Sequence, residues 1–107
     1  MSNSKVKDVS AEEAYTLINE NNELVILDVR TKEEYDNGHI PGAKLVPVQI
    51  LPMKIAELDK YKEKPVLVYC ASGGRSPRAV DTLANSDFTN LYHLSRGISS
   101  WRYNVTK

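Results

Sequence analysis

The sequence contains few of the residues that form covalent or metal cross-links in small domains. Among its 107 residues are one cysteine and two histidines. A single cysteine excludes an internal disulfide, and these three side chains are too few for a pair of metal-ligand clusters. We therefore expect no metal site. The cysteine, Cys70, is left as either a small buried hydrophobe or a reactive thiol.

Two further absences concern charge and long apolar runs. Lysine and arginine together number 14, and so do aspartate and glutamate, so no excess positive charge attracts nucleic acid or an anionic membrane surface. No run approaches the roughly 18 apolar residues of a membrane helix, and the first ten residues, MSNSKVKDVS, lack the apolar segment of a secretory signal. We expect a cytoplasmic protein without nucleic-acid or membrane partners, in which any anion recognition is local.

What is present predicts one α/β domain, extending over about residues 6–103. Two capping boxes mark helix starts, Ser10-Ala11-Glu12-Glu13 and Thr31-Lys32-Glu33-Glu34. The first precedes apolar residues at helical spacing, and Asn21-Asn22 ends that helix. The second opens a short helical turn, which a Gly-rich turn over residues 38–42 follows.

Apolar runs predict the strands, and between them lie further helices. The expected strands cover residues 24–29, 43–46, 65–70 and 90–94. The expected helices cover 49–58, with a late start because of Pro52, then a helix that begins near Ser76, and a terminal helix that carries Ile98 and Trp101. This alternation predicts a mainly parallel sheet covered by helices on both faces.

The segment Cys70 to Ser76, CASGGRS, connects the most apolar strand to the following helix. We expect Ser76 to cap that helix and Pro77 to occupy its first position. Open parallel sheets bind ligands beyond the carboxyl ends of their strands, where Cys70 and Asp28 both lie. The segment is therefore the candidate site.

A thiol needs help to react, because only about 3% of a free cysteine is ionised at neutral pH. Unpaired N–H groups at the helix start, backbone amides turned inward at Gly73 and Gly74, and the guanidinium of Arg75 would each favour the thiolate, without a histidine base. The same donors would bind an oxyanion such as a sulfonate, phosphate or arsenate. The alternative is an ordinary buried cysteine in a tight turn; we favour the reactive interpretation.

Three groups of residues, in this order, resemble the rhodanese-like domain family, single-domain sulfurtransferase type. They are Asp28-Val29-Arg30 with Glu34-Tyr35 and Gly38-His39-Ile40-Pro41-Gly42-Ala43, then Cys70 to Ser76, and last Leu94 with Gly97 and Trp101. The resemblance implies a three-layer fold with a five-stranded parallel sheet flanked by helices on both faces.

The same resemblance implies a role for each residue of the segment. Cys70 would accept a sulfane sulfur as a persulfide, and the loop that binds the substrate would comprise Ala71, Ser72, Gly73, Gly74, Arg75 and Ser76. A donor such as thiosulfate would leave as sulfite, and cyanide or a thiol would collect the sulfur. No cofactor is implied. Ala71 stands where many thiosulfate-using members have a cationic or larger polar residue, so thiosulfate is expected to be a weak donor.

Two other functions remain open. The chain has no second cysteine to resolve a persulfide, so the sulfur must pass to an external acceptor, and a sulfur-accepting protein would make the domain a relay or binding module with little turnover. A small phosphatase or arsenate reductase is the third hypothesis. Phosphatases of this architecture resemble Cys-x5-Arg, whereas Cys70 and Arg75 form Cys-x4-Arg, and the shorter loop favours sulfur.

Residues outside the loop are interpreted mainly as structural. We expect Asp28 and Arg30 to support the site, hydrogen-bonded together with Glu34, which lies four residues beyond Arg30. We expect His39 to pack and hydrogen-bond within its turn, and His93 to lie half-buried in the last strand. Trp101 is expected to fill the core at the end of the domain.

Overall fold

Five short strands form a single parallel sheet in the computed structural model, which describes residues 6–107. The order across the sheet is β1-β5-β4-β2-β3, and each neighbouring pair is parallel. The strands are β1 (Val6–Val9), β2 (Val25–Asp28), β3 (Lys44–Leu45), β4 (Val66–Tyr69) and β5 (Leu91–Leu94). Residues 1–5, part of the segment on which the expectation of no secretory signal depends, lie outside the described residues.

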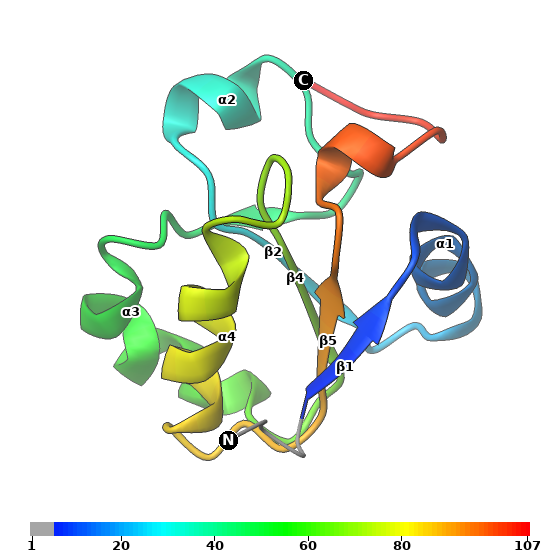
Figure 1. Ribbon diagram of the computed structural model, residues 1–107. Coiled ribbons are helices and arrows are strands. Elements are labelled where there is room, and N and C mark those ends of the chain that lie inside the picture. Colours follow the sequence, from blue (N-terminus) through cyan, green and yellow to red (C-terminus); the bar gives the residue numbers. More distant parts are fainter. Residues whose placement is uncertain (1–5) are drawn as a thin grey trace.

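Helices cover both faces of this sheet, and Figure 1 shows α3 and α4 on one side and α1 on the other. The helices are α1 (Ala11–Glu20), α2 (Lys32–Asp36), α3 (Leu51–Leu58) and α4 (Ser76–Ala84), with the 3-10 turns η1 (Asp59–Tyr61) and η2 (Ile98–Ser100). The predicted three-layer α/β fold with a five-stranded parallel sheet is therefore confirmed.

The central strand β4 explains why its sequence is apolar throughout. Val66 and Val68 belong to the core cluster beneath α3 and α4, whereas Leu67 and Tyr69 belong to the cluster beneath α1. All four residues are 0% exposed. A strand that is buried on both faces cannot alternate polar with apolar residues, and this strand fixes the position of Cys70 directly after it.

Both predicted capping boxes are present. Ser10 accepts from the Glu13 amide while the Glu13 carboxylate accepts from the Ser10 amide, and Thr31 and Glu34 make the same reciprocal pair. Each box satisfies amide donors that the first helical turn leaves unpaired. Asn21 ends α1, as expected.

Two predictions about the ends of the domain differ from the structure. The predicted terminal helix is only the 3-10 turn η2, and Trp101 follows it in an extended conformation. The hydroxyls of Ser99 and Ser100 donate to carbonyls three residues earlier, Arg96 and Gly97, which competes with continued helix formation. Trp101 is half-buried rather than a fully enclosed core residue.

Strand β1 was not predicted, because Lys7 and Asp8 interrupt its hydrophobic pattern. It pairs with β5 at the edge of the sheet, with Asp8 opposite His93. At the other end, the chain continues beyond residue 103, and Thr106 pairs with His39 in an antiparallel bridge.

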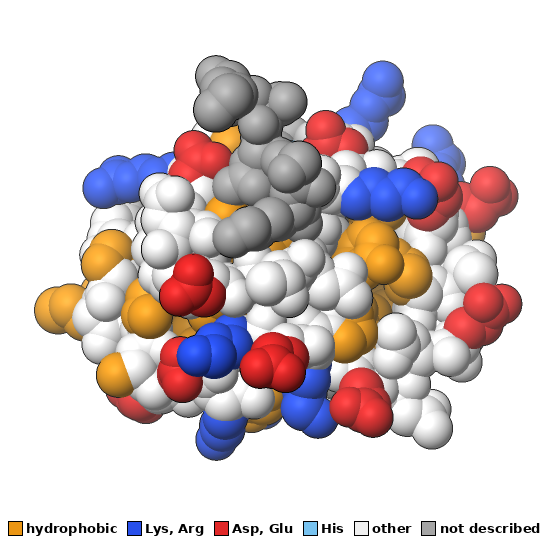
Figure 2. All heavy atoms as spheres, turned by 90° about the horizontal axis from the view of Figure 1, so that it is seen from below, with side chains coloured by type: hydrophobic (Ala, Val, Ile, Leu, Met, Phe, Trp, Pro, Cys, Tyr) orange, Lys and Arg blue, Asp and Glu red, His pale blue; other side chains and the backbone are white. Residues whose placement is uncertain are grey.

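Figure 2 shows the molecule from below the view of Figure 1, with acidic and basic side chains interspersed over this face rather than in separate patches. Within residues 6–107, no helix combines the length and apolar character needed to cross a membrane.

Candidate active site

The loop that follows β4 forms the candidate site. It extends from Cys70 to Ser76, where α4 begins, and rises at the carboxyl edge of the sheet between the α4 side and η2 (Figure 1). Cys70 is 1% exposed and belongs to the core cluster beneath α3 and α4, whereas Ser72 and Gly74 are exposed at the top of the loop. The sulfur therefore lies at the base of the loop.

Backbone amides of the loop point toward this sulfur. The amide of Gly73 donates to Cys70 Sγ at 3.1 Å and that of Ser76 at 3.4 Å, while the Ser76 hydroxyl lies 3.3 Å from Sγ. Burial raises the pKa of the Cys70 thiol, but the Ser76 hydroxyl and the amides of Arg75, Ser76 and Gly73 outweigh burial and lower that pKa below its usual value. The loop thus favours a thiolate.

Only one of the two adjacent glycines requires its residue type. Gly73 has φ +96°, and a Cβ there would overlap the carbonyl oxygen of Ser95, whereas a Cβ on Gly74 would meet nothing within 4 Å. Gly73 is thus fixed by a left-handed conformation and by a close approach of the backbone. Gly74 leaves open space at the top of the loop.

The turn that precedes and begins η2 is hydrogen-bonded to the start of the loop. The amide of Ile98 donates to the Cys70 carbonyl at 2.9 Å, and that of Ser99 donates to the Ala71 carbonyl at 3.0 Å. A Cβ on Gly97 would lie 2.5 Å from the same two carbonyl oxygens. Gly97 therefore lets two chain segments approach closely, which explains the glycine that the sequence has at this position.

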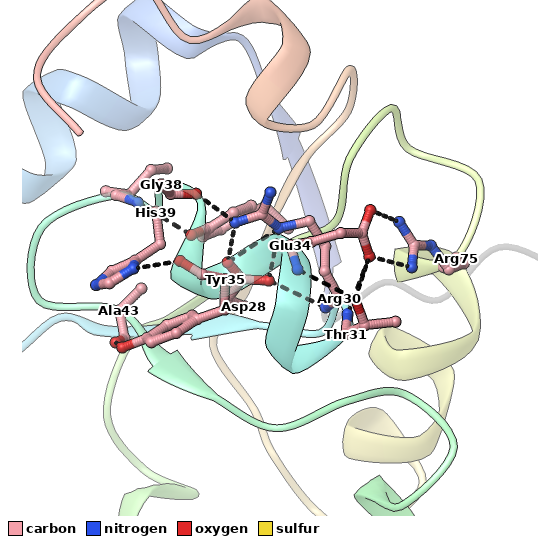
Figure 3. Close-up of polar contacts among 11 residues, drawn as sticks. Asp28, Arg30, Thr31, Glu34, Tyr35, Gly38, His39, Ala43 and Arg75 are labelled. Atoms are coloured by element: carbon pink, nitrogen blue, oxygen red, sulfur yellow. Dashed lines mark hydrogen bonds and ion pairs between the residues drawn. The ribbon is translucent and has the colours of Figure 1, made fainter. Parts of the chain in front are cut away.

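The guanidinium of Arg75 points to a different partner than expected. It donates to both carboxylate oxygens of Glu34, at 2.8 Å each, and joins the loop to α2 (Figure 3). This bidentate contact lowers the pKa of Glu34 to about 2. Arg75 influences the thiol mainly through its backbone amide, because the charge of its side chain is balanced by Glu34.

Asp28 and Arg30 form a separate buried ion pair. Arg30 Nε and Nη2 donate to the Asp28 carboxylate at distances from 2.6 to 3.1 Å, and Nη2 also donates to the Gly38 carbonyl at 2.7 Å (Figure 3). The expected contact of Arg30 with Glu34 is replaced by these bonds. The pair fixes the turn after α2, and its hydrogen bonds among the described residues do not reach the Cys70 loop.

His39 lies in this turn, as predicted. Its Nδ1 is 2.9 Å from the Tyr35 carbonyl oxygen, and its ring stacks on the ring of Tyr35 with 3.7 Å between the centroids. The Tyr35 hydroxyl in turn donates to the Ala43 carbonyl (Figure 3). These contacts are local and structural.

Ser76 does not cap α4, contrary to prediction. The cap position is Arg75, without a side-chain hydrogen bond, and Ser76 is the first helical residue, so Pro77 occupies the second position. The Ser76 hydroxyl instead lies 2.5 Å from His93 Nε2 in addition to its contact with Cys70. The Ser76 hydroxyl therefore contacts these two side chains, and Ser76 lies one residue too far into the helix to be its cap.

His93 was expected to be structural, and its contact with the loop was not anticipated. It is 8% exposed, and its Nδ1 lies 3.0 Å from a carboxylate oxygen of Asp8. The one signal in the sequence is a polar residue within the otherwise apolar strand LYHL. That signal indicates a buried polar side chain but gives no indication of its partners.

Comparisons with known proteins show which family the chain resembles. The family model of the rhodanese-like domain matches residues 10–104. The Escherichia coli (strain K12) protein YibN is 34% identical over 99 residues, which cover 92% of this chain and 68% of that protein. The thiosulfate sulfurtransferase GlpE of Coxiella burnetii (strain RSA 331) is 35% identical over 101 residues, covering 90% of this chain and 87% of that protein.

Among solved structures, a rhodanese-like domain protein from Staphylococcus aureus superposes with a TM-score of 0.77 and 30% sequence identity. The match covers 89% of this chain and 90% of that one.

Proposed function

The chain belongs to the rhodanese-like domain family, and from this membership we propose that it is a sulfurtransferase that carries a sulfane sulfur on Cys70. The observation that carries the proposal is the convergence of the Gly73 and Ser76 amides and the Ser76 hydroxyl on one buried Sγ. These hydrogen-bond donors stabilise negative charge on the sulfur. A persulfide anion is the species that such donors would hold after the first transfer.

The reaction has two balanced steps. The Cys70 thiolate attacks the outer sulfur of a donor such as thiosulfate, the sulfur–sulfur bond of the donor breaks, and sulfite leaves with the electron pair. A nucleophile such as cyanide or a thiolate then attacks the outer sulfur of the persulfide, and the Cys70 thiolate leaves with its electron pair. Because Cys70 is 1% exposed, we expect the donor to be small or to present its sulfur on a narrow end.

Intact mass spectrometry tests the proposal directly. The wild-type protein and the Cys70→Ser variant are each exposed to thiosulfate and freed of excess reagent, and their intact masses are then measured. We expect the first to gain one sulfur atom that cyanide removes, and the variant to gain none. Equal gain by both proteins would reject Cys70 as the sulfur carrier, and no gain with thiosulfate or with an organic persulfide donor would reject sulfur transfer.

One observation favours a relay with little turnover as a second candidate function. Ala71 contributes no polar side chain, and the guanidinium of Arg75 is engaged by Glu34. The loop therefore has weak means of attracting a dianionic donor, although it can still hold a persulfide for a partner protein. Steady-state transfer from thiosulfate to cyanide distinguishes the two: high turnover supports the enzyme, and stoichiometric persulfide without turnover supports the relay.

The hypothesis of a phosphatase or arsenate reductase receives less support from the same contact. Arg75 would have to face the loop centre to bind a tetrahedral oxyanion, whereas its two donors face Glu34. Hydrolysis of an aryl phosphate that depends on Cys70 would favour this function over sulfur transfer.

A further inference from the structure

A chain of four side chains connects the buried thiol to the surface. Cys70 Sγ lies 3.3 Å from Ser76 Oγ, which lies 2.5 Å from His93 Nε2, and His93 Nδ1 lies 3.0 Å from Asp8 Oδ1. Cys70, Ser76 and His93 are each more than nine-tenths buried. The Asp8 side chain is 73% exposed, so the chain ends in solvent.

The topology of the sheet produces this alignment. Asp8 of β1 is the register partner of His93 in β5, and His93 is the partner of Val68 in β4, two residues before Cys70. Side chains two residues apart on a strand point to the same face, so His93 and Cys70 share the face that α4 covers. Ser76, at the start of α4, fills the space between them.

The possible hydrogen positions are few. A carboxylate only accepts, so the hydrogen bond to Asp8 requires a hydrogen on His93 Nδ1. In one arrangement the Cys70 thiol donates to Ser76 Oγ, and the Ser76 hydroxyl donates to an unprotonated Nε2. In the other, protonated Nε2 donates to Ser76 Oγ, and the hydroxyl donates to a Cys70 thiolate. Both arrangements satisfy every group in the chain.

We propose that His93 accepts the proton of the Cys70 thiol through the Ser76 hydroxyl, while Asp8 holds the ring in the tautomer that leaves Nε2 free to accept. This inference deepens the sulfurtransferase proposal and rests on it. One proton moves from Sγ to Oγ as another moves from Oγ to Nε2, so the products are a thiolate, an unchanged serine and an imidazolium. No electrons are transferred and no co-reactant is needed. His93 acts through Ser76 and is therefore a positioning residue for the thiolate.

The surroundings leave few competing charges. His93 faces Asp8 of β1 and apolar Val68 of β4. The charged residue at the cap position of α4 is Arg75, whose guanidinium is paired with Glu34 of α2. Among the described residues, an unbalanced positive charge on His93 would thus meet two anions, the Cys70 thiolate and Asp8. The pair of the Cys70 thiolate and the His93 imidazolium would be buried, which strengthens their attraction.

The test measures the rate at which iodoacetamide alkylates the protein as a function of pH. Cys70 is the only cysteine in the sequence, so the rate reports its thiolate without any sulfur donor. We expect His93→Gln, which keeps a hydrogen-bonding side chain but cannot take up the proton, to react about tenfold more slowly than wild type at pH 7. The two rates should converge at high pH, where solvent ionises the thiol.

Further variants distinguish a lost proton transfer from a folding defect. Asp8→Asn alters an exposed carboxylate, keeps an acceptor for Nδ1 and should shift the profile in the same direction by a smaller amount. Asp81→Asn, an exposed carboxylate on α4, is the matched control and should leave the profile unchanged. Ser76→Ala should slow alkylation about as much as His93→Gln. The double variant Ser76→Ala/His93→Gln should react little more slowly than either single variant, because both changes interrupt the same proton transfer.

The outcomes separate the two proposals. If the profiles of His93→Gln and Asp8→Asn superpose on that of wild type, the proposed proton transfer is overturned, even if the persulfide forms normally. Additive losses in the double variant would overturn it as well. A shifted profile together with a wild-type protein that takes up no sulfur would support the proton transfer to His93 and reject sulfur transfer.

Discussion

Arg75 donates two hydrogen bonds to the Glu34 carboxylate, from Nη1 to Oε1 and from Nη2 to Oε2, both at 2.8 Å. The contact ties the first residue before α4 to the first turn of α2, although the two residues are 41 positions apart. Glu34 also closes the capping box of α2 through Thr31. One carboxylate thus serves both a helix start and the candidate site.

The first prediction concerns donor affinity. In Glu34→Gln the charge that balances Arg75 is lost, so the guanidinium becomes free to attract an anionic donor, while glutamine preserves the capping box. We expect KM for thiosulfate to fall by about threefold, in line with the modest energy of a partly exposed ion pair. Steady-state kinetics measure this change. Glu33→Gln, an exposed neighbour on α2, is the control, and an unchanged or higher KM in Glu34→Gln would contradict the prediction.

The second prediction follows from the pKa of Glu34, which falls from 4.5 to about 2 in the folded protein. A carboxyl whose pKa is lowered by folding stabilises the folded state above its unfolded pKa, and that contribution is lost as the pH falls through the folded value. Wild type should therefore lose its stability advantage over Glu34→Gln between about pH 4.5 and pH 2. Urea unfolding at several pH values measures it. A difference that stays constant across this window would show that the pair does not form in solution.

The third prediction contrasts the two glycines of the loop. Gly73→Ala forces a side chain into a left-handed conformation with φ +96° and against the Ser95 carbonyl. We expect a loss of about 1 to 3 kcal/mol in the free energy of unfolding, together with slower alkylation of Cys70, because the Gly73 amide turns away from Sγ. Gly74→Ala is the matched control, since a Cβ there meets nothing within 4 Å. Chemical denaturation and iodoacetamide kinetics are measured on both; equal behaviour would contradict the assignment.

The fourth prediction concerns the buried pair of Asp28 and Arg30, which are 0% and 6% exposed. Asp28→Asn or Arg30→Met leaves one charge buried without its partner, which costs about 3 to 5 kcal/mol. The double variant Asp28→Leu/Arg30→Met should be more stable than either single variant, because no unpaired charge remains. Thermal or urea unfolding measures the order of stability.

The same variants test whether this pair is only structural. Its hydrogen bonds go to Gly38 and within the pair rather than to the loop. In any variant that folds, the pH profile of Cys70 alkylation should match that of wild type. A shifted profile would instead place Asp28 or Arg30 in the electrostatic environment of the thiol.

Local chemistry determined those features that sequence analysis predicted well. Ser10 with Glu13, and Thr31 with Glu34, lie three residues apart, so their capping boxes can form within one turn regardless of the rest of the chain. The apolar runs before Asp28 and Cys70 are buried on both faces wherever they lie in a covered parallel sheet. These short-range patterns suffice to predict the fold class and to place the thiol at the end of a strand.

Edge and terminal elements were predicted less well, because their local preferences are weak. Strand β1 carries Lys7 and Asp8 on a four-residue segment and exists through its pairing with β5. The turn η2 is shortened by serine hydroxyls that bind nearby carbonyls. In β1 the pairing with a distant strand outweighs local propensity, whereas η2 ends because of hydrogen bonds within its own turn.

The sequence by itself determined that a lone cysteine follows a buried strand and precedes a stretch rich in small residues, because those features depend on neighbours only a few positions away. Only the tertiary structure decided which distant side chains the residues around that cysteine contact. Arg75 meets Glu34 across 41 residues, Ser76 meets His93 across 17, and His93 meets Asp8 across 85. Strand order and register bring these side chains together, and no local pattern encodes which distant polar group a buried side chain will contact.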